Sequence, residues 1–161
     1  MPGMRARVLV ATIAVMIVMP AARAQEQWFG TWQVNVAKST YPSGPPAFKR
    51  MTCTIEPWED GVLVTYDIVG NRGGVTHTEW VGKFDGRDYR VAGIDGYTVT
   101  HAYRRVDDRT YDVVQKTEGA ATLTARMVVS TDGQTLTTFT PAERAPGAAP
   151  VTVTVFDRRP R

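Results

Sequence analysis

Hydrophobic and polar side chains alternate along most of the chain after residue 27. β-branched and aromatic residues recur at every second position, and no segment repeats its apolar residues at the roughly 3.6-residue period of an amphipathic helix. Turn-forming residues separate these runs about every ten positions. The pattern predicts an all-β domain of ten strands, at residues 28–36, 48–56, 62–69, 75–84, 88–92, 97–106, 110–117, 121–130, 135–140 and 150–158.

The connections between the predicted strands are short and rich in acid–glycine pairs. Such pairs tolerate the positive φ angles of tight hairpins. They are Glu59-Asp60-Gly61, Asp85-Gly86, Asp95-Gly96 and Asp132-Gly133, with a looser version at 70–74. Short turns make neighbours in sequence neighbours in the sheet, and closing the sheet on itself removes its exposed edges. We therefore predict a single antiparallel up-and-down β-barrel of about eight to ten strands.

Two connections differ from these short hairpin turns, because they are longer and rich in proline. The first runs from Tyr41 to Pro46, and we expect it to lie over one end of the barrel. The second runs from Pro141 to Pro150, before the last strand. If these loops projected instead, residues 38–48 and 141–150 would form an interaction or inhibitor surface.

The first 24 residues have the three parts of a secretory leader. Arg5 and Arg7 precede an uncharged run from Val8 to Met19, and Ala22-Arg23-Ala24 supplies the small residues of a cleavage site. A membrane anchor is the rival interpretation, but a spanning helix needs about 20 apolar residues and this run is shorter. We predict a signal peptide at 1–24 and one mature domain at 25–161, located in the periplasm or secreted.

Removal of the leader changes the charge of the protein. The full chain has 19 basic and 16 acidic residues, and the three arginines of the leader account for the whole excess. The mature domain then has no net charge and no run of like charges, which argues against nucleic acid as a partner. No Cys follows the cleavage site, so we expect no lipid anchor and no stable membrane insertion after cleavage; the oligomeric state is left open.

Cys53 is the single cysteine, so the chain forms no internal disulfide. It alternates with threonines in Met51-Thr52-Cys53-Thr54-Ile55, which indicates a buried strand residue. The alternative is a reactive thiol, but no neighbouring His or Asn supports it. We expect Cys53 to pack in the core.

Gly30-Thr31-Trp32 on the first predicted strand resembles the Gly-x-Trp signature of lipocalins and the wider calycin group, which includes fatty-acid-binding proteins. That resemblance implies that Trp32 packs across the closed end of a barrel, against a basic residue of the last strand. Arg158, or its neighbour Arg159, is placed for that role. Gly30, Trp32 and Arg158 are therefore predicted structural residues.

The mature chain as a whole is similar to a family of exported bacterial lipocalin-like proteins of unassigned function. The matching stretches are Gly30–Asn35, Lys38-Ser39, Tyr41-Pro42, Gly44-Pro45, Phe84–Tyr89, Arg105–Asp107 with Thr110, and Val129–Leu136. Where members often end the last strand in Tyr-Glu-Lys, this chain has Phe156-Asp157-Arg158. The resemblance implies a barrel but carries no ligand and no catalytic residues.

Two predicted strands carry the candidate binding residues, because side chains on a barrel strand alternate between inside and outside. In strand 75–84, Trp80 shares a face with Thr76, Thr78 and Phe84, which places His77 outside beside Glu79. In strand 97–106, one face holds Tyr97, Val99, His101, Tyr103 and Arg105. Trp80, Tyr97, His101 and Tyr103 are the predicted ligand-binding residues. The alternative for His101 is a core histidine that bonds a tyrosine.

Catalytic and metal chemistry has little support in the sequence. Serine is scarce, no nucleophile elbow or phosphate-binding loop is present, and two His with one Cys are a poor supply of metal ligands. We predict no catalytic residues, no metal and no cofactor. The sequence favours an exported barrel that holds a small apolar or amphipathic molecule. An acid–base enzyme of the isomerase or cyclase type, using His101 or an acid such as Asp67 or Asp95, is the other alternative.

Overall fold

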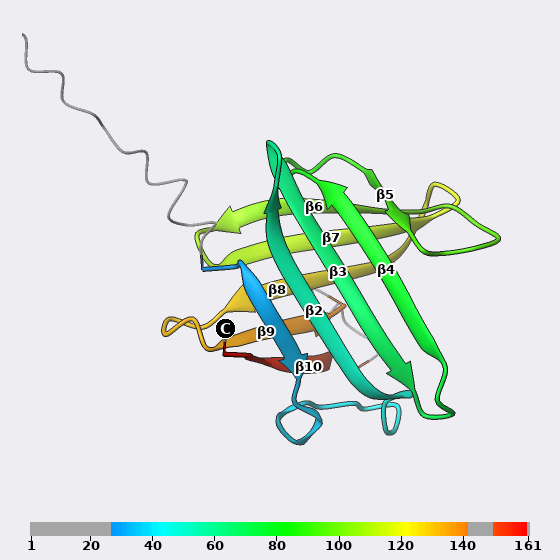
Figure 1. Cartoon of the computed structure of the whole chain (residues 1–161), viewed down its shortest axis with the longest axis vertical. Helices are drawn as coiled ribbons and strands as arrows, with labels where there is room; N and C mark the ends of the chain where they lie inside the picture. The colour runs from blue at the N-terminus through cyan, green and yellow to red at the C-terminus, as the bar shows by residue number, and fades with distance from the viewer. Residues whose placement is uncertain (1–26, 142–149, 161) are drawn as a thin grey trace, which may run out of the picture.

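Ten antiparallel strands close into a barrel in the computed structural model, which describes residues 27–141 and 150–160 (Figure 1). The strands are β1 (Gly30–Val34), β2 (Phe48–Trp58), β3 (Gly61–Gly70), β4 (Val75–Gly82), β5 (Tyr89–Ala92), β6 (Val99–Asp107), β7 (Thr110–Thr117), β8 (Ala120–Val129), β9 (Thr135–Thr140) and β10 (Thr152–Arg158). In Figure 1, β2, β3 and β4 form the front wall, and β6, β7 and β8 cross behind them.

Every strand pairs with its neighbours in sequence, and the barrel closes where β1 meets β10. In that closing pair, Trp32 lies opposite Arg158 and Val34 lies opposite Phe156. The predicted all-β, up-and-down barrel is therefore confirmed, and all ten predicted strands are present.

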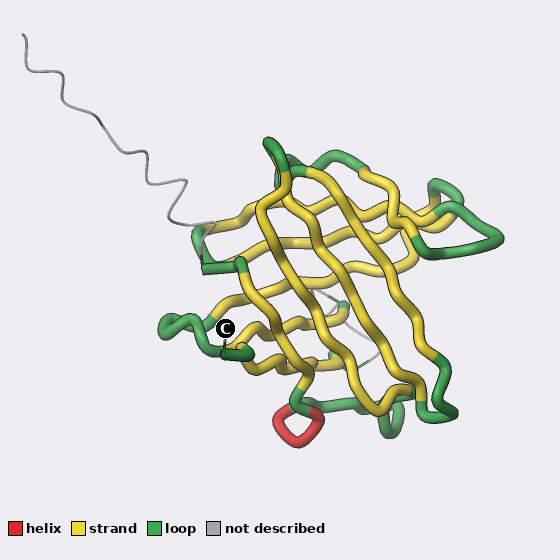
Figure 2. Tube along the Cα trace, in the orientation of Figure 1, coloured by secondary structure: helices red, strands yellow, loops and turns green. Residues whose placement is uncertain are grey.

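The first strand is shorter than the predicted range 28–36. It ends at Val34 because Asn35 starts a turn of 3-10 helix, η1 (Val36–Lys38), drawn red in Figure 2. The Asn35 side chain accepts a hydrogen bond from the Lys38 backbone N–H at 3.2 Å, which caps that turn.

The apolar side chains of alternate strand positions meet inside the barrel. The buried core consists of Trp28, Trp32, Val34, Cys53, Ile55, Val62, Val64, Trp80, Val91, Val99, Tyr103, Tyr111, Val113, Ala125, Met127, Val129, Leu136 and Phe156. The predicted burial of Cys53 is confirmed.

Aromatic rings fill the end of the barrel where β1 begins and β6 turns into β7, which we call the closed end. The rings of Trp28 and Tyr111 meet edge to face at 4.6 Å, and Phe84 lies 4.3 Å from Tyr111 between ring centroids. The Trp80 ring stacks on Phe84 at 6.1 Å. Large rings at this end leave the unfilled part of the barrel at the opposite end, where β3 turns into β4 and β7 into β8.

Most of the acid–glycine turns have the predicted backbone. Gly86, Gly96 and Gly133 all adopt positive φ. The first turn differs, because Glu59 takes the positive φ of 47° while Gly61 is already the first residue of β3. A Cβ at Gly61 would lie 2.5 Å from the Gly82 carbonyl oxygen, so this glycine serves close strand approach rather than turn geometry.

The first proline-rich connection is held against the barrel at the end opposite the aromatic rings. Thr40 forms a bridge with Val153, and the Asn71 side chain donates a hydrogen bond to the Pro46 carbonyl at 3.0 Å. The Tyr41 ring packs edge to face on Phe48. The predicted position at one end of the barrel is correct for this loop. Most of the second predicted connection, Pro141 to Pro150, lies outside the described residues, because only its two end residues are described, and so does the predicted leader at 1–24.

Among the residues that the structure describes, no helix combines the length and apolar character needed to cross a bilayer.

Candidate functional site

A cavity of about 480 Å³ occupies the barrel interior on the side away from the closed end. Nine of the ten strands, all except β1, and the β5–β6 loop contribute to its wall. The lining residues are Met51, Tyr66, Ile68, Thr78, Val91, Ile94, His101, Tyr103, Val113, Gln115, Leu123, Ala125, Met127, Thr138, Thr140, Thr154 and Phe156. Leu123 is 38 % exposed, so the cavity reaches the surface at the start of β8.

The wall of the cavity is mainly apolar and contains no charged side chain. Aliphatic, methionine and aromatic groups supply most of its surface, and none of the lining residues is Lys, Arg, Asp or Glu. The polar groups are four threonine hydroxyls, two tyrosine hydroxyls, the His101 imidazole and the Gln115 amide. A few polar groups in an apolar enclosure are typical of sites that orient a small molecule.

His101 is held by Gln115 from the neighbouring strand. The His101 Nε2 atom lies 3.1 Å from Gln115 Oε1, and the Gln115 amide nitrogen donates to Thr122 Oγ1 at 3.3 Å. Because the amide nitrogen is committed to Thr122, the amide oxygen accepts from His101, which places the imidazole proton on Nε2. His101 Nδ1 is then an acceptor, and this atom is buried with no hydrogen-bond partner among the described residues.

The titratable groups around the cavity are all biased toward their neutral forms. Burial lowers the pKa of His101 below its usual value, so its ring is neutral at pH 7. Burial raises the pKa of Tyr103 and of Tyr66, so both phenols keep their protons. Behind Tyr66, burial raises the pKa of the Cys53 thiol to about 12, and the two side chains share a hydrogen bond.

Trp80 supports the cavity wall rather than forming it. Its ring is buried, with its centroid 4.5 Å from that of Tyr103. Its indole N–H donates to the His101 carbonyl at 3.1 Å, which links β4 directly to the strand that carries His101. Trp80 does not line the cavity, so its contact with a ligand would be indirect.

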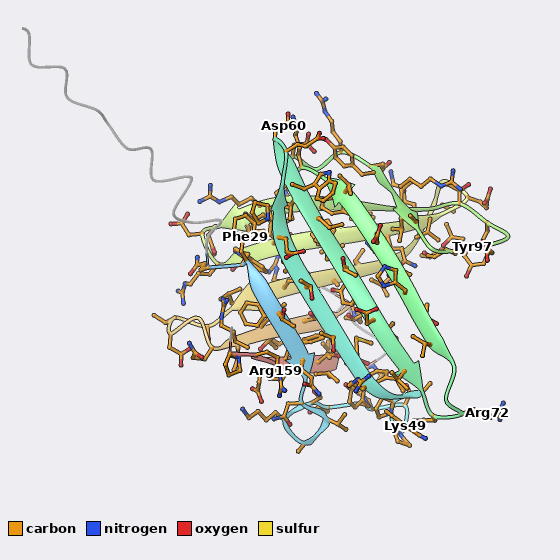
Figure 3. All side chains as sticks on the ribbon, in the orientation of Figure 1. Phe29, Lys49, Asp60, Arg72, Tyr97 and Arg159 are labelled. Atoms are coloured by element: carbon orange, nitrogen blue, oxygen red, sulfur yellow. The ribbon has the colours of Figure 1, made fainter. Side chains whose placement is uncertain are left out.

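Tyr97 lies away from the other predicted binding residues. Strand β6 begins at Val99, not at residue 97, and Tyr97 belongs to the loop that projects at the right of Figure 3. Its side chain is 53 % exposed and does not line the cavity. The predicted alternation is correct from Val99 to Tyr103, and it fails at Tyr97 because Asp95-Gly96 turns the chain out of the sheet.

The sequence did not identify the residues that β8, β9 and β10 contribute. Thr138 and Thr154 are cross-strand partners that both line the cavity, and Ala125 and Met127 face it from β8. In β9, threonines occupy both faces, so the alternation of polar and apolar residues could not indicate which of them point inward.

The closed end is secured by Gly30, Trp32 and Arg158, as the Gly-x-Trp resemblance implied. The guanidinium of Arg158 lies over the Trp32 ring, 4.0 Å from its centroid. Trp32 is fully buried and donates from its indole to the Trp28 carbonyl at 3.0 Å. A Cβ at Gly30 would lie 2.6 Å from Arg158 Nη1, so only glycine leaves room for the guanidinium.

His77 lies on the outer surface of β4, as predicted. Its Nδ1 atom is 2.7 Å from Asp67 Oδ1 and its Nε2 atom is 3.1 Å from Glu79 Oε1. These hydrogen bonds raise the pKa of His77. In the described part of the chain, no group of three or more His, Cys, Asp and Glu side chains is arranged to hold a metal ion.

Neither the models of known protein families nor the curated proteins include a match to this chain. The fold is therefore established by the closed ten-stranded antiparallel barrel itself, which is consistent with a calycin-like fold.

Proposed function

We propose that this protein is an exported lipocalin-like barrel that holds a small apolar or amphipathic molecule in its interior, in the periplasm or outside the cell. The observation that carries the proposal is the cavity of about 480 Å³ inside the barrel, on the side away from the closed end. Its volume falls within the roughly 300–1,000 Å³ range of small-molecule sites.

The distribution of packing along the barrel supports a binding role. At the closed end, the aromatic rings and the Arg158–Trp32 contact seal the barrel. Further along the same strands, smaller side chains such as Ala125, Thr138 and Thr154 face inward, and the interior is left unfilled. A domain selected for stability alone would fill this volume, because each unfilled part of a core costs free energy.

The leader pattern supports export. A basic start, an uncharged run from Val8 to Met19 and a small-residue cleavage site precede the barrel. The predicted mature domain has no net positive charge to attract the phosphates of nucleic acid, which is consistent with a carrier of small molecules.

Binding in the cavity is tested by titrating the exported protein with N-phenylnaphthylamine, an uncharged fluorophore whose emission rises in apolar surroundings. We expect saturable enhancement at one molecule per barrel. Native mass spectrometry of protein purified from its own cell envelope then identifies a co-purifying ligand.

A cavity-filling substitution provides the matched control. Ala125→Phe places a ring in the cavity and is expected to weaken fluorophore binding at least about tenfold, a loss of roughly 1.4 kcal/mol. Thr124 directly precedes Ala125 and does not line the cavity, so Thr124→Phe is expected to leave binding unchanged. Equal binding by the wild type and Ala125→Phe, with both folded, would place the fluorophore elsewhere and contradict the proposal.

A further inference from the structure

We infer that the cavity selects an uncharged, mostly apolar molecule that carries a hydroxyl group, and that it excludes carboxylates and ammonium ions of the same length. This inference rests on the proposed function and specifies its ligand class.

The first argument is the absence of charge inside the cavity. None of its lining residues carries a formal charge, and Tyr66, Tyr103 and His101 are neutral at pH 7. An ion brought into such a cavity loses its hydration without gaining a counter-ion, which disfavours its binding. A neutral molecule of the same length avoids that cost.

The second argument is the location of the basic residues on the inward-facing side of the strands. Arg105 and Arg158 both lie at the closed end, beyond the aromatic rings. Arg105 pairs with Asp108. Arg158 lies on Trp32 and donates to the carbonyl of Phe29 at 2.7 Å. Neither guanidinium lines the cavity, so neither is placed to neutralise a carboxylate there.

The third argument is the kind of polar group that remains. On β6 and β7, His101 and Gln115 form one polar patch, and on β9 and β10 Thr138 and Thr154 form another. Strand β8 separates the two patches with apolar side chains.

A hydroxyl group matches these patches because it both donates and accepts hydrogen bonds. Threonine hydroxyls accept and donate in the same way. Within the described part of the chain, the buried His101 Nδ1 acceptor has no hydrogen-bond donor, and an unsatisfied buried acceptor is costly. A ligand hydroxyl that reaches the imidazole would supply that donor.

The test compares three ligands with the same alkyl chain on the exported protein at pH 7. Dodecanol, dodecanoate and dodecylammonium compete against bound N-phenylnaphthylamine. We expect dodecanol to displace the fluorophore, and the two ions to be weaker by about tenfold or more. Dodecanoate that competes as well as dodecanol would overturn the inference, and so would failure of dodecanol to displace a fluorophore that does bind.

A charge introduced into the wall gives a second, independent readout. Thr138→Lys places an ammonium in the cavity and is expected to improve dodecanoate competition relative to dodecanol by about tenfold. Thr137→Lys adds the same charge at the adjacent residue, which does not line the cavity, and is expected to keep the wild-type preference. A Thr137→Lys protein that gains dodecanoate binding equally would show that surface charge, not the cavity, sets the preference.

The two proposals fail in distinguishable ways. If the fluorophore does not bind the wild-type protein in a saturable manner, the proposed function is wrong and the ligand class falls with it. If it binds and is displaced without regard to charge, the barrel binds small molecules but the inferred selectivity is wrong.

Discussion

The guanidinium of Arg158 lies over the Trp32 ring, with its central carbon 4.0 Å from the ring centroid, and joins the last strand of the barrel to the first. The same guanidinium donates to the backbone carbonyls of Gln27, Phe29 and Gly133. One side chain therefore ties together the segment before β1, the β8–β9 turn and the aromatic end of the barrel.

Arg158→Lys is expected to destabilise the barrel although it keeps the positive charge. An ammonium lacks the planar fork that stacks on Trp32 while bonding three carbonyls, so we expect a loss of about 2 kcal/mol in the free energy of unfolding. Urea denaturation followed by tryptophan fluorescence measures it. Arg159→Lys, at the exposed neighbouring residue, serves as control and should change stability by less than about 0.5 kcal/mol. Equal stability of the two variants would contradict the role of Arg158.

Gly30→Ala is expected to lower the free energy of unfolding strongly, although it adds only one methyl group. The new methyl group would lie 2.6 Å from Arg158 Nη1, and φ at this residue is +144°, which L side chains rarely adopt. We expect a cost of about 2–4 kcal/mol in thermal or urea unfolding. Gly44 also has a positive φ, but a Cβ there would meet no atom within 4 Å. A much smaller loss of stability in Gly44→Ala would therefore show that the clash with Arg158, and not the backbone strain, accounts for most of the effect of Gly30→Ala.

The Cys53 thiol is expected to be unreactive in the folded protein. Burial raises its pKa to about 12, so the thiolate that reacts with iodoacetamide is almost absent at pH 8. Mass spectrometry should show no alkylation of the native protein and complete alkylation after unfolding in urea. Rapid labelling without urea would show that the core opens around β2.

The two histidines are expected to affect stability in opposite directions as pH changes. Asp67 and Glu79 raise the pKa of His77, so its contribution is fully present below the unfolded pKa of about 6.5 and is lost as pH rises through the folded value. Burial lowers the pKa of His101, so the unfolded chain takes up the proton first. Stability is then lost as pH falls from about 6.5 to the folded value.

Thermal unfolding of His77→Gln and His101→Gln between about pH 5 and pH 8 separates the two effects. Relative to the wild type, His77→Gln should lose more stability at the acid end, and His101→Gln should remove part of the acid-induced loss. The same pH dependence in both variants would mean that neither environment shifts the histidine as the structure indicates.

The strands were predictable because a barrel strand has one buried and one exposed face, so apolar and polar residues alternate along its sequence. Trp80 on β4 and Val99 and Tyr103 on β6 are buried as the alternation predicts. The prediction failed at Tyr97, where a turn interrupts the alternation, and at Thr138, where threonines occupy both faces of the strand and give no signal.

By itself, the sequence determined the all-β class, the order of the ten strands and the burial of Cys53, since each depends on local alternation or turn chemistry. Only the tertiary structure decided that the interior is hollow and uncharged, and that His101 faces Gln115 while Arg105 and Arg158 lie at the other end. The physical reason is that a cavity is what remains when ten strands have packed together, so its size and charge depend on side chains distant in sequence.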